Sequence, residues 1–346
     1  MVLLRVAPCR TSTDNGAVKA AAYWTVGPGR GEIRPAFIDP PAPDEVQVRA
    51  LYSAISRGTE SLVHRHAVPE SVRHLMRAPF QEGDLPGPVK YGYLSVGIVE
   101  RGPAELRAKR VFCLHPHQSR YVVPAAAVVP VPDDVPSQRA VLAGPVETAV
   151  NALWDAAPRI GDRIAVVGLG MVGASVAALL TGFPLSRLEV VDIDPGRAEL
   201  GARLGVHVVT PDAAAGDCDV VLHCSATEAG LATALRLAGD EAEVVELSWY
   251  GSDAPRVPLG ESFHARRLTI RASQVGVVSA ARRNRRSTTD RLAAALAALS
   301  DARFDALLSD VSDFAELPEV MDDIASGRRP ALCHLIRYPE EESCSA

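Results

Sequence analysis

The sequence predicts an α/β protein of two domains, a barrel-like β domain followed along the chain by a doubly wound parallel sheet. The chain has 346 residues, which suits two domains, and nearly half of them are apolar, which suits large cores. Short runs with apolar residues at alternate positions, broken by proline and glycine, extend as far as about Pro132. From about Ala140 to Gly276, strand-like and helix-like segments alternate.

The first region contains three runs whose period of two favours strands with one buried face. These runs are Glu45–Leu51, Ser95–Glu100 and Tyr121–Val123. Together they predict an antiparallel, barrel-like arrangement. The polar stretch Asp133–Gln138 is expected to connect this region to the next.

The second region begins with the apolar run Arg163–Val167, which is typical of a strand buried on both faces. A helix is expected at Ala174–Leu180. The expected elements then continue as a strand at Leu188–Val191, a helix at Arg197–Leu204, and strands at Asp219–His223 and Glu243–Leu247. Such alternation favours a parallel sheet with helices on both faces.

The last region is expected to hold a helix at Asp290–Leu299 and a terminal strand at Ala331–Tyr338. We expect Glu340–Ala346 to form a frayed tail. The basic run Arg282–Arg286 precedes the helix. We interpret it either as a solvated loop or as a patch that meets an anionic substrate or the cofactor.

Composition excludes several classes of protein. The sequence has no run of about 18 apolar residues, and Met1–Arg5 does not begin a signal peptide, so we expect no membrane contact and a cytoplasmic location. The formal net charge of -6 disfavours nucleic acid as a partner. Six scattered cysteines without a C-x-x-C pair predict reduced thiols rather than disulfides or structural zinc.

The sharpest motif is a glycine-rich stretch that follows a predicted strand and opens a predicted helix. Gly168 allows a tight turn, Gly170 lets a pyrophosphate approach the backbone, and Gly173 lets the helix pack close to the strand. Met171 and Val172 complete the motif at the helix start, where free N–H groups favour negative charge. The motif predicts a Rossmann domain that binds a dinucleotide. The alternative is a Rossmann domain that binds another ligand or none.

An acidic residue at the end of the next strand is the second part of this signal. Asp192 follows the strand that ends at Val191, and its carboxylate is expected to accept hydrogen bonds from the adenosine ribose and to repel a 2′-phosphate. The cofactor predicted is therefore NAD rather than NADP. Asp194 is the alternative acid, although its position suits the turn better. Arg197 is expected either to stack near the adenine or to be solvated.

With these features the chain resembles the medium-chain dehydrogenase/reductase superfamily over nearly its whole length. The resemblance rests on the glycine motif with Asp192 and on five further segments, which are residues 53–60, 92–99, 263–270, 317–321 and 327–331. It implies a GroES-like catalytic domain formed by residues 1–140 and 277–346, around a Rossmann NAD(H)-binding domain at residues 141–276. It also implies a small-molecule substrate and a homodimer.

The chain departs from this superfamily at the zinc positions. Arg57 stands where zinc-dependent members have a cysteine, Tyr93 where they have the histidine of Gly-His-Glu, and Gly144 where they have the third ligand. The structural zinc lobe with its four cysteines is absent as well, so we predict no zinc at either family site. The pairs His64-Arg65-His66 and His115-Pro116-His117 are the remaining metal candidates, if they lie in strands and converge. Otherwise they line a pocket or lie on the surface.

Carbonyl reduction without zinc needs a group that stabilises the alkoxide and a proton donor. Arg57 is expected to polarise the substrate oxygen or to form an ion pair with Glu60, which we expect to orient it. Tyr93 is expected to donate the proton or to pack in the pocket. The resemblance implies a proton-relay role for Thr59. His115 is a further candidate acid or base, as is its neighbour in the second histidine pair.

Further candidates are expected to face the cofactor. The resemblance places Thr148 against the nicotinamide, and Glu147 is interpreted as a general base or as a helix-start acid. Ser273 and Gln274 follow the sixth strand of the Rossmann sheet, where ligands lie outside the carboxyl ends of the strands. We expect them to contact the nicotinamide ribose or carboxamide, with Trp249-Tyr250 lining the same cleft.

These observations predict an enzyme that interconverts a secondary alcohol, polyol-like or a biosynthetic intermediate, and its ketone with NAD(H). One alternative is a zinc-free enoyl or quinone reductase, a class that usually prefers NADPH. Another is an epimerase or lyase that uses tightly bound NAD, and a third is a dinucleotide sensor without catalysis.

Overall fold

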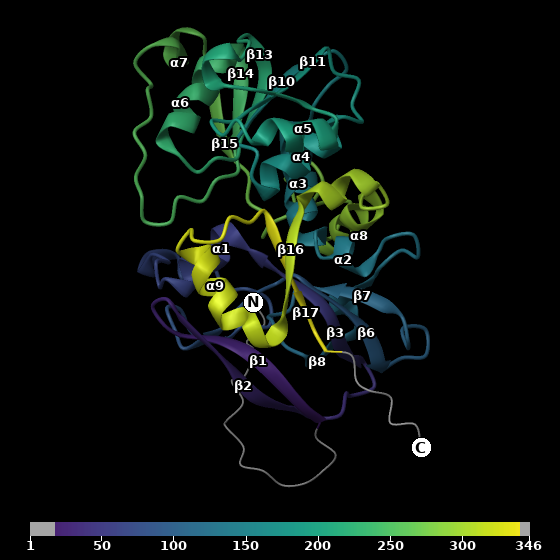
Figure 1. Ribbon diagram of the computed structural model, residues 1–346. Coiled ribbons are helices and arrows are strands. Elements are labelled where there is room, and N and C mark those ends of the chain that lie inside the picture. Colours follow the sequence, from purple (N-terminus) through teal and green to yellow (C-terminus); the bar gives the residue numbers. More distant parts are fainter. Residues whose placement is uncertain (1–17, 340–346) are drawn as a thin grey trace.

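The structure is a computed structural model that describes residues 18–339. The expectations for Met1–Arg5 and for Glu340–Ala346 therefore lie outside the described residues. Figure 1 shows a parallel sheet flanked by helices at one end of the molecule and the remaining sheets at the other, with α3 and α8 near their junction.

The parallel sheet has six strands in the order β12-β11-β10-β13-β14-β15, and every neighbouring pair is parallel. Its strands are β10 (Arg163–Val167), β11 (Arg187–Val191), β12 (His207–Val209), β13 (Cys218–His223), β14 (Ala238–Glu246) and β15 (Thr269–Ala272). This is the strand order of a doubly wound sheet, with its topological switch between β10 and β13. The predicted parallel sheet is confirmed, as is each strand predicted within it.

Helices cover both faces of this sheet. The helices in and beside this half are α3 (Ala143–Ala156), α4 (Met171–Leu180), α5 (Arg197–Leu204), α6 (Glu228–Leu237), α7 (Ser262–Ala265) and α8 (Thr288–Ala298). Because successive side chains of β10 point to opposite faces, Ile164 and Val166 pack with α3 and α4, whereas Ala165 and Val167 pack with α6. This alternation explains why the whole strand is apolar.

The other half contains a seven-stranded sheet in the order β16-β17-β3-β6-β7-β9, with β8 also paired to β3. Its strands are β3 (Glu45–Ser56), β6 (Ser95–Arg101), β7 (Arg110–Cys113), β8 (Arg120–Pro124), β9 (Val128–Pro130), β16 (Leu308–Asp313) and β17 (Cys333–Arg337). The antiparallel arrangement predicted for the first region is confirmed by the pairs β3–β6, β3–β8, β6–β7 and β7–β9. The last region adds one parallel pair, β16 with β17. The crossover between them contains α9 (Leu317–Ala325), a connection that parallel neighbours require.

A smaller four-stranded sheet and short helices complete this half. The sheet comprises β1 (Val18–Gly27), β2 (Arg30–Ile38), β4 (Glu82–Gly83) and β5 (Val89–Lys90). The short helices are α1 (Arg57–His64), α2 (Ser137–Ala140) and the 3-10 turns η1 (Glu70–Val72), η2 (Ala125–Ala127), η4 (Ala302–Leu307) and η5 (Phe314–Glu316). A further 3-10 turn, η3 (Pro211–Ala213), lies between β12 and β13 of the parallel sheet. The expected connection at Asp133–Gln138 is shorter than predicted, because α2 begins at Ser137.

The last strand joins the two ends of the chain. β17 pairs antiparallel with β3, so that Cys333 lies opposite Ser56 and Ile336 opposite Ser53. Since α1 follows β3 directly, the C-terminal strand helps to fix the start of α1. Within residues 18–339, no helix has the length and apolar character needed to cross a membrane.

Candidate active site

Two glycines of the motif are required by close contacts. Gly168 has a φ of +99°, and a Cβ there would lie 2.8 Å from the backbone of Ser225. A Cβ on Gly173 would lie 1.9 Å from the Gly168 carbonyl oxygen. Only glycine allows the positive φ without strain and the close approach of α4 to the strand.

Gly170 differs, because its Cβ position faces open space with no described atom within 4 Å. It is the N-cap of α4, and no side chain caps that end. The first N–H groups of a helix have no partner within the helix. The open space and the uncapped helix start together fit the pyrophosphate of a dinucleotide.

Asp192 ties the glycine loop to the turn after β11. Its carboxylate accepts hydrogen bonds from the backbone N–H of Leu169, at 2.7 Å, and of Asp194, at 2.9 Å. The side chain is half-buried, and each oxygen keeps lone pairs for further donors. Arg197 forms an ion pair with Asp194 at 3.4 Å, so that its guanidinium is held beside this turn.

The residues at the family zinc positions have distinct surroundings. Arg57 opens α1 and is exposed, and no hydrogen bond or ion pair joins its side chain to any of residues 18–339. Burial and the nearby Glu60 carboxylate raise the pKa of Tyr93 to about 12, against the opposing effect of hydrogen bonds with Ser56 and Thr59. The phenol is therefore protonated at neutral pH.

Leu94 fills the space beside the third position. A Cβ on Gly144 would lie 2.2 Å from Leu94 Cδ2, and the Leu94 side chain is fully buried. Any ligand-bearing residue at position 144 therefore meets this leucine. No group of three metal-binding side chains occurs among residues 18–339.

Glu60 does not orient Arg57, and that expectation is wrong. Its Oε1 accepts a hydrogen bond from the Ser56 backbone N–H at 2.8 Å, and its Oε2 lies 2.8 Å from His117 Nε2. Both side chains are buried, at 3% and 1% exposure. Because α1 turns Glu60 inward, together with Val63, the carboxylate meets the imidazole rather than the exposed guanidinium.

The hydrogen bonds continue beyond His117. Its Nδ1 lies 2.7 Å from Ser53 Oγ, which in turn lies 3.0 Å from Tyr338 Oη. Gly92 leaves room for the imidazole, since a Cβ there would lie 2.9 Å from the His117 ring. Four buried side chains thus form one chain, Glu60–His117–Ser53–Tyr338. Sequence reasoning favoured His115 over His117 and missed this order.

His115 has the surroundings of a core imidazole. It stacks on Tyr121 with the ring centroids 3.8 Å apart, and Phe80 stacks against it with a centroid separation of 5.7 Å. Burial holds the pKa of His115 well below its usual range, so the ring is neutral. Its Nδ1 lies 2.9 Å from the Pro116 carbonyl oxygen and donates to it. Nothing in this arrangement brings His115 to Tyr93.

The first histidine pair does not lie in a strand, contrary to the condition set for a metal site. His64 is the last residue of α1, and His66 has a left-handed backbone with a φ of 57°. His64 Nδ1 lies 3.1 Å from Tyr23 Oη, and its Nε2 lies 3.4 Å from Asp322 Oδ1. The two pairs therefore have separate partners.

Comparison with known proteins was informative at the level of the fold. No family model matches the chain. L-threonine 3-dehydrogenase of Rhizobium rhizogenes is 28% identical over 117 residues, which are 34% of this chain and 33% of the relative. (R,R)-butanediol dehydrogenase of Saccharomyces cerevisiae is 27% identical over 120 residues, 35% of this chain and 28% of the relative. The matched segment thus spans about a third of the length of these relatives.

The likeness to solved structures covers nearly the whole chain. L-idonate 5-dehydrogenase of Escherichia coli K-12 has a TM-score of 0.76 at 16% identity, over 93% of this chain and 99% of that one. An alcohol dehydrogenase of E. coli CFT073 complexed with NADH has a TM-score of 0.73 at 16% identity, over 92% and 99%. A putative zinc-binding dehydrogenase of Sinorhizobium meliloti bound to NADP has the same values. At these identities the likeness shows that the chain has the fold of these dehydrogenases. Its fold pairs a GroES-like domain with a Rossmann domain, as predicted.

Three residues that were predicted to contact the cofactor form hydrogen bonds within the protein. The Thr148 hydroxyl donates to the Gly144 carbonyl oxygen at 3.1 Å, and the Ser273 hydroxyl donates to Asp155 at 2.7 Å. Gln274 Oε1 accepts from the Gly276 N–H at 2.7 Å and lies at the surface. Their contacts with a nicotinamide remain predictions.

Glu147 is engaged in a buried ion pair that sequence reasoning missed. Arg291, at 2% exposure, donates from Nε to Glu147 Oε1 at 3.0 Å and from Nη1 to Asn151 Oδ1 at 2.6 Å. Its Nη2 donates to the Val275 carbonyl oxygen at 2.6 Å. This guanidinium binds α3 and α8 to the segment after β15, so Glu147 is not placed as a general base. A lone arginine on the buried face of a predicted helix was the available signal.

Another buried histidine lies at the carboxyl ends of β13 and β14, near the glycine loop. His223 is fully buried, with Nδ1 2.7 Å from Glu246 Oε2 and Nε2 2.7 Å from Ser225 Oγ. Tyr250, one of the predicted cleft residues, donates its hydroxyl to Glu246 Oε2 at 3.2 Å. Hydrogen bonds with His223 and Ser248 outweigh burial and lower the pKa of Glu246. The signal missed was a polar residue ending each of two apolar strands.

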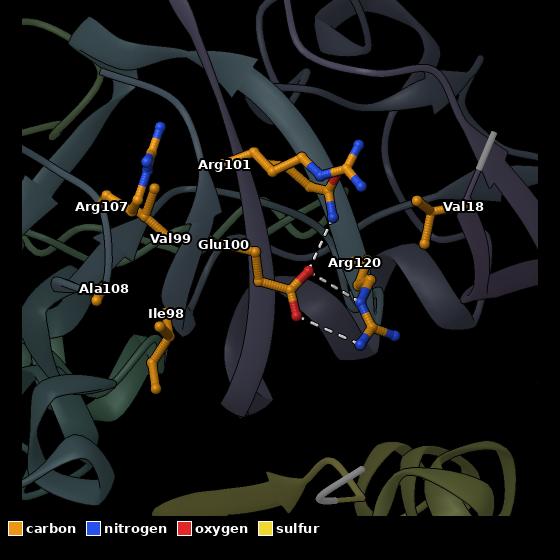
Figure 2. A pocket seen from close by; sticks show the side chains of 9 residues that line it. Val18, Ile98, Val99, Glu100, Arg101, Arg107, Ala108 and Arg120 are labelled. Carbon is orange, nitrogen blue, oxygen red and sulfur yellow. Dashed lines mark hydrogen bonds and ion pairs between the residues drawn. The ribbon is translucent and has the colours of Figure 1, made fainter. Parts of the chain in front are cut away.

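A cavity of about 560 Å³ lies away from all these groups, on the seven-stranded sheet. Figure 2 shows its centre, where Glu100 accepts hydrogen bonds from Arg120 and from Gln47. No predicted site residue lines it.

Proposed function

We propose that the chain is an NAD(H)-dependent oxidoreductase that interconverts a secondary alcohol and its ketone without zinc. The observation that carries this is the Tyr93 phenol, which stands where the resemblance implies a zinc ligand and which burial and the Glu60 charge keep protonated. When bound, the nicotinamide supplies or accepts the hydride. The alcohols named for the similar dehydrogenases support this substrate class.

The preference for NAD rests on Asp192. Structures similar to this one include complexes with NADH and with NADP, so the fold alone does not decide. Asp192 presents a half-exposed carboxylate beside the glycine loop, where a ribose 2′-phosphate would be repelled. The neighbouring cation, Arg197, is already paired with Asp194.

Tyr93 donates the proton to the alkoxide in the reducing direction and takes it back in the oxidising direction. Its raised pKa keeps the proton on the phenol until an alkoxide, a stronger base, forms beside it. The side chains of Ser56 and Thr59 favour its anion, because they act to lower the pKa of Tyr93. The exposed Arg57 is available to polarise the substrate oxygen or to hold a substrate carboxylate.

The same proposal includes the organisation of the protein. Residues 1–140 and 277–346 form the catalytic domain, and residues 141–276 form the cofactor domain. The substrate is a small molecule, the protein is cytoplasmic, and two copies form a homodimer. Light scattering coupled to gel filtration measures the mass of the assembly, and a mass of 36.7 kDa, that of one chain, would contradict the homodimer.

The test combines metal analysis with turnover assays. Purified protein is expected to oxidise secondary alcohols with NAD and to contain less than one zinc ion per chain. Stoichiometric zinc bound by GroES-like domain side chains would contradict the zinc-free part. Reduction of enones with NADPH would indicate a double-bond reductase, and turnover without net change of cofactor an epimerase or lyase. Binding of NADH without any turnover would indicate a sensor.

A further inference from the structure

We infer that a proton path crosses the β domain from Glu60 to Tyr338 and opens into a second cavity on its far side. The inference rests on the proposed function, because it supplies the proton that carbonyl reduction consumes. It assigns His117, Ser53 and Tyr338 to proton movement.

The path is continuous and shielded. Its three hydrogen bonds measure 2.8 Å, 2.7 Å and 3.0 Å between heavy atoms. None of its four side chains is more than 4% exposed. Carboxylate, imidazole and hydroxyl groups can each both take up and release a proton. Buried bonds of this kind strengthen one another in a low dielectric.

The outer end lies at a cavity of about 790 Å³. Tyr338 lines it together with Tyr52 and the ion pair between Arg337 and Asp313, whose side chains are more than half exposed. A cavity of this size with charged groups at its rim admits water. The path requires water there to reach the Tyr338 phenol, which is 4% exposed.

The inner end lies at the proposed proton donor. Glu60 Oε1 accepts from the backbone N–H of Ser56, and the charge of Glu60 contributes to the raised pKa of Tyr93. The path requires a substrate hydroxyl or a water molecule to connect the two side chains.

The proton shifts balance. In carbonyl reduction the His117 Nε2 proton moves to Glu60 Oε2, the Ser53 hydroxyl proton to His117 Nδ1, and the Tyr338 phenol proton to Ser53. Water in the cavity returns a proton to Tyr338 and becomes hydroxide. Glu60 then gives its proton to the reacting oxygen or to the Tyr93 phenolate. Alcohol oxidation reverses every shift.

The test compares two tyrosines of the same cavity. Tyr338→Phe keeps the stacking on Phe314 and removes only the hydroxyl at the end of the path. Tyr52→Phe is the matched control, since Tyr52 lines the cavity and its hydroxyl accepts from Gln138 at 3.3 Å, off the path. The measurements are kcat, the rate ratio in H2O and D2O, and the Kd for NADH.

We expect Tyr338→Phe to lower kcat by about tenfold or more and to raise the solvent isotope effect, with the Kd unchanged. Tyr52→Phe is expected to change none of these. Ser53→Ala should behave as Tyr338→Phe, and Ser53→Thr, which keeps the hydroxyl, should restore much of the rate. If Tyr338→Phe does not fold, the two Ser53 variants test the path instead.

Failure of the path and failure of the proposed function give different results. If the wild type turns over and neither Tyr338→Phe nor Ser53→Ala alters kcat or the isotope effect, the path is refuted and the proposed function stands. If the wild type turns over no alcohol or carbonyl, the proposed function is refuted and the path with it.

Discussion

The Glu60 carboxylate lies 2.8 Å from the His117 imidazole, although 57 positions separate the two residues in the sequence. The charge of Glu60 also contributes to the raised pKa of Tyr93. A buried carboxylate is stable only with charged or hydrogen-bonding partners. His117 and the Ser56 N–H provide them.

Replacing Asp192 with alanine should weaken NADH binding by about tenfold and ease the use of NADPH, because hydrogen bonds to a charged group are each worth about 1.5–3 kcal/mol. Fluorescence titration with both cofactors measures this. Asp194→Ala is the control, since its carboxylate pairs with Arg197 rather than with the glycine loop. Unchanged affinity of Asp192→Ala for both cofactors would remove Asp192 from the cofactor site.

Replacing Tyr93 with phenylalanine should lower kcat by about a hundredfold or more, as expected for loss of a positioned general acid, and leave the Kd for NADH unaltered. Stopped-flow assays separate the two. Full activity of the variant would assign the proton to another group.

The pH profile of the wild type tests the same phenol. Its folded-state pKa, raised to about 12, lies above the ordinary tyrosine value of about 10, so the phenol keeps its proton as pH rises through that value. We expect no loss of reducing activity assignable to Tyr93 between about pH 8 and pH 10. A tyrosine titration with a midpoint near the ordinary value, followed by ultraviolet absorbance and absent from Tyr93→Phe, would contradict this.

Replacing Arg57 with alanine should reduce turnover more than cofactor affinity. Because the side chain is exposed and makes no hydrogen bond or ion pair with residues 18–339, the melting temperature should stay the same. Thermal unfolding and steady-state kinetics check the two parts. Wild-type turnover in Arg57→Ala would exclude Arg57 from the mechanism.

Replacing Arg291 with methionine should destabilise the fold by about 3–5 kcal/mol, because Glu147 is left charged and buried without its partner. Urea unfolding measures the change. The double variant with Glu147→Gln should recover part of the loss. A single variant as stable as the wild type would show that the ion pair contributes nothing.

The sequence predicted what local patterns determine. The glycine motif and Asp192 lie at a strand–helix junction, and their spacing follows from backbone sterics. The contact of Glu60 with His117 could not be predicted from the sequence, because it depends on how β3 and the loop after β7 meet in space. The strand that a metal site at His64 and His66 would have needed does not form, since α1 continues the chain from β3 through His64.

Gly144 and Leu94 constrain each other. A substitution that introduced any side chain at position 144 would collide with the fully buried Leu94 side chain. A smaller residue at position 94 would make room for it, but by itself leaves a destabilising void. Compatible changes at these two positions are therefore expected to occur as a pair.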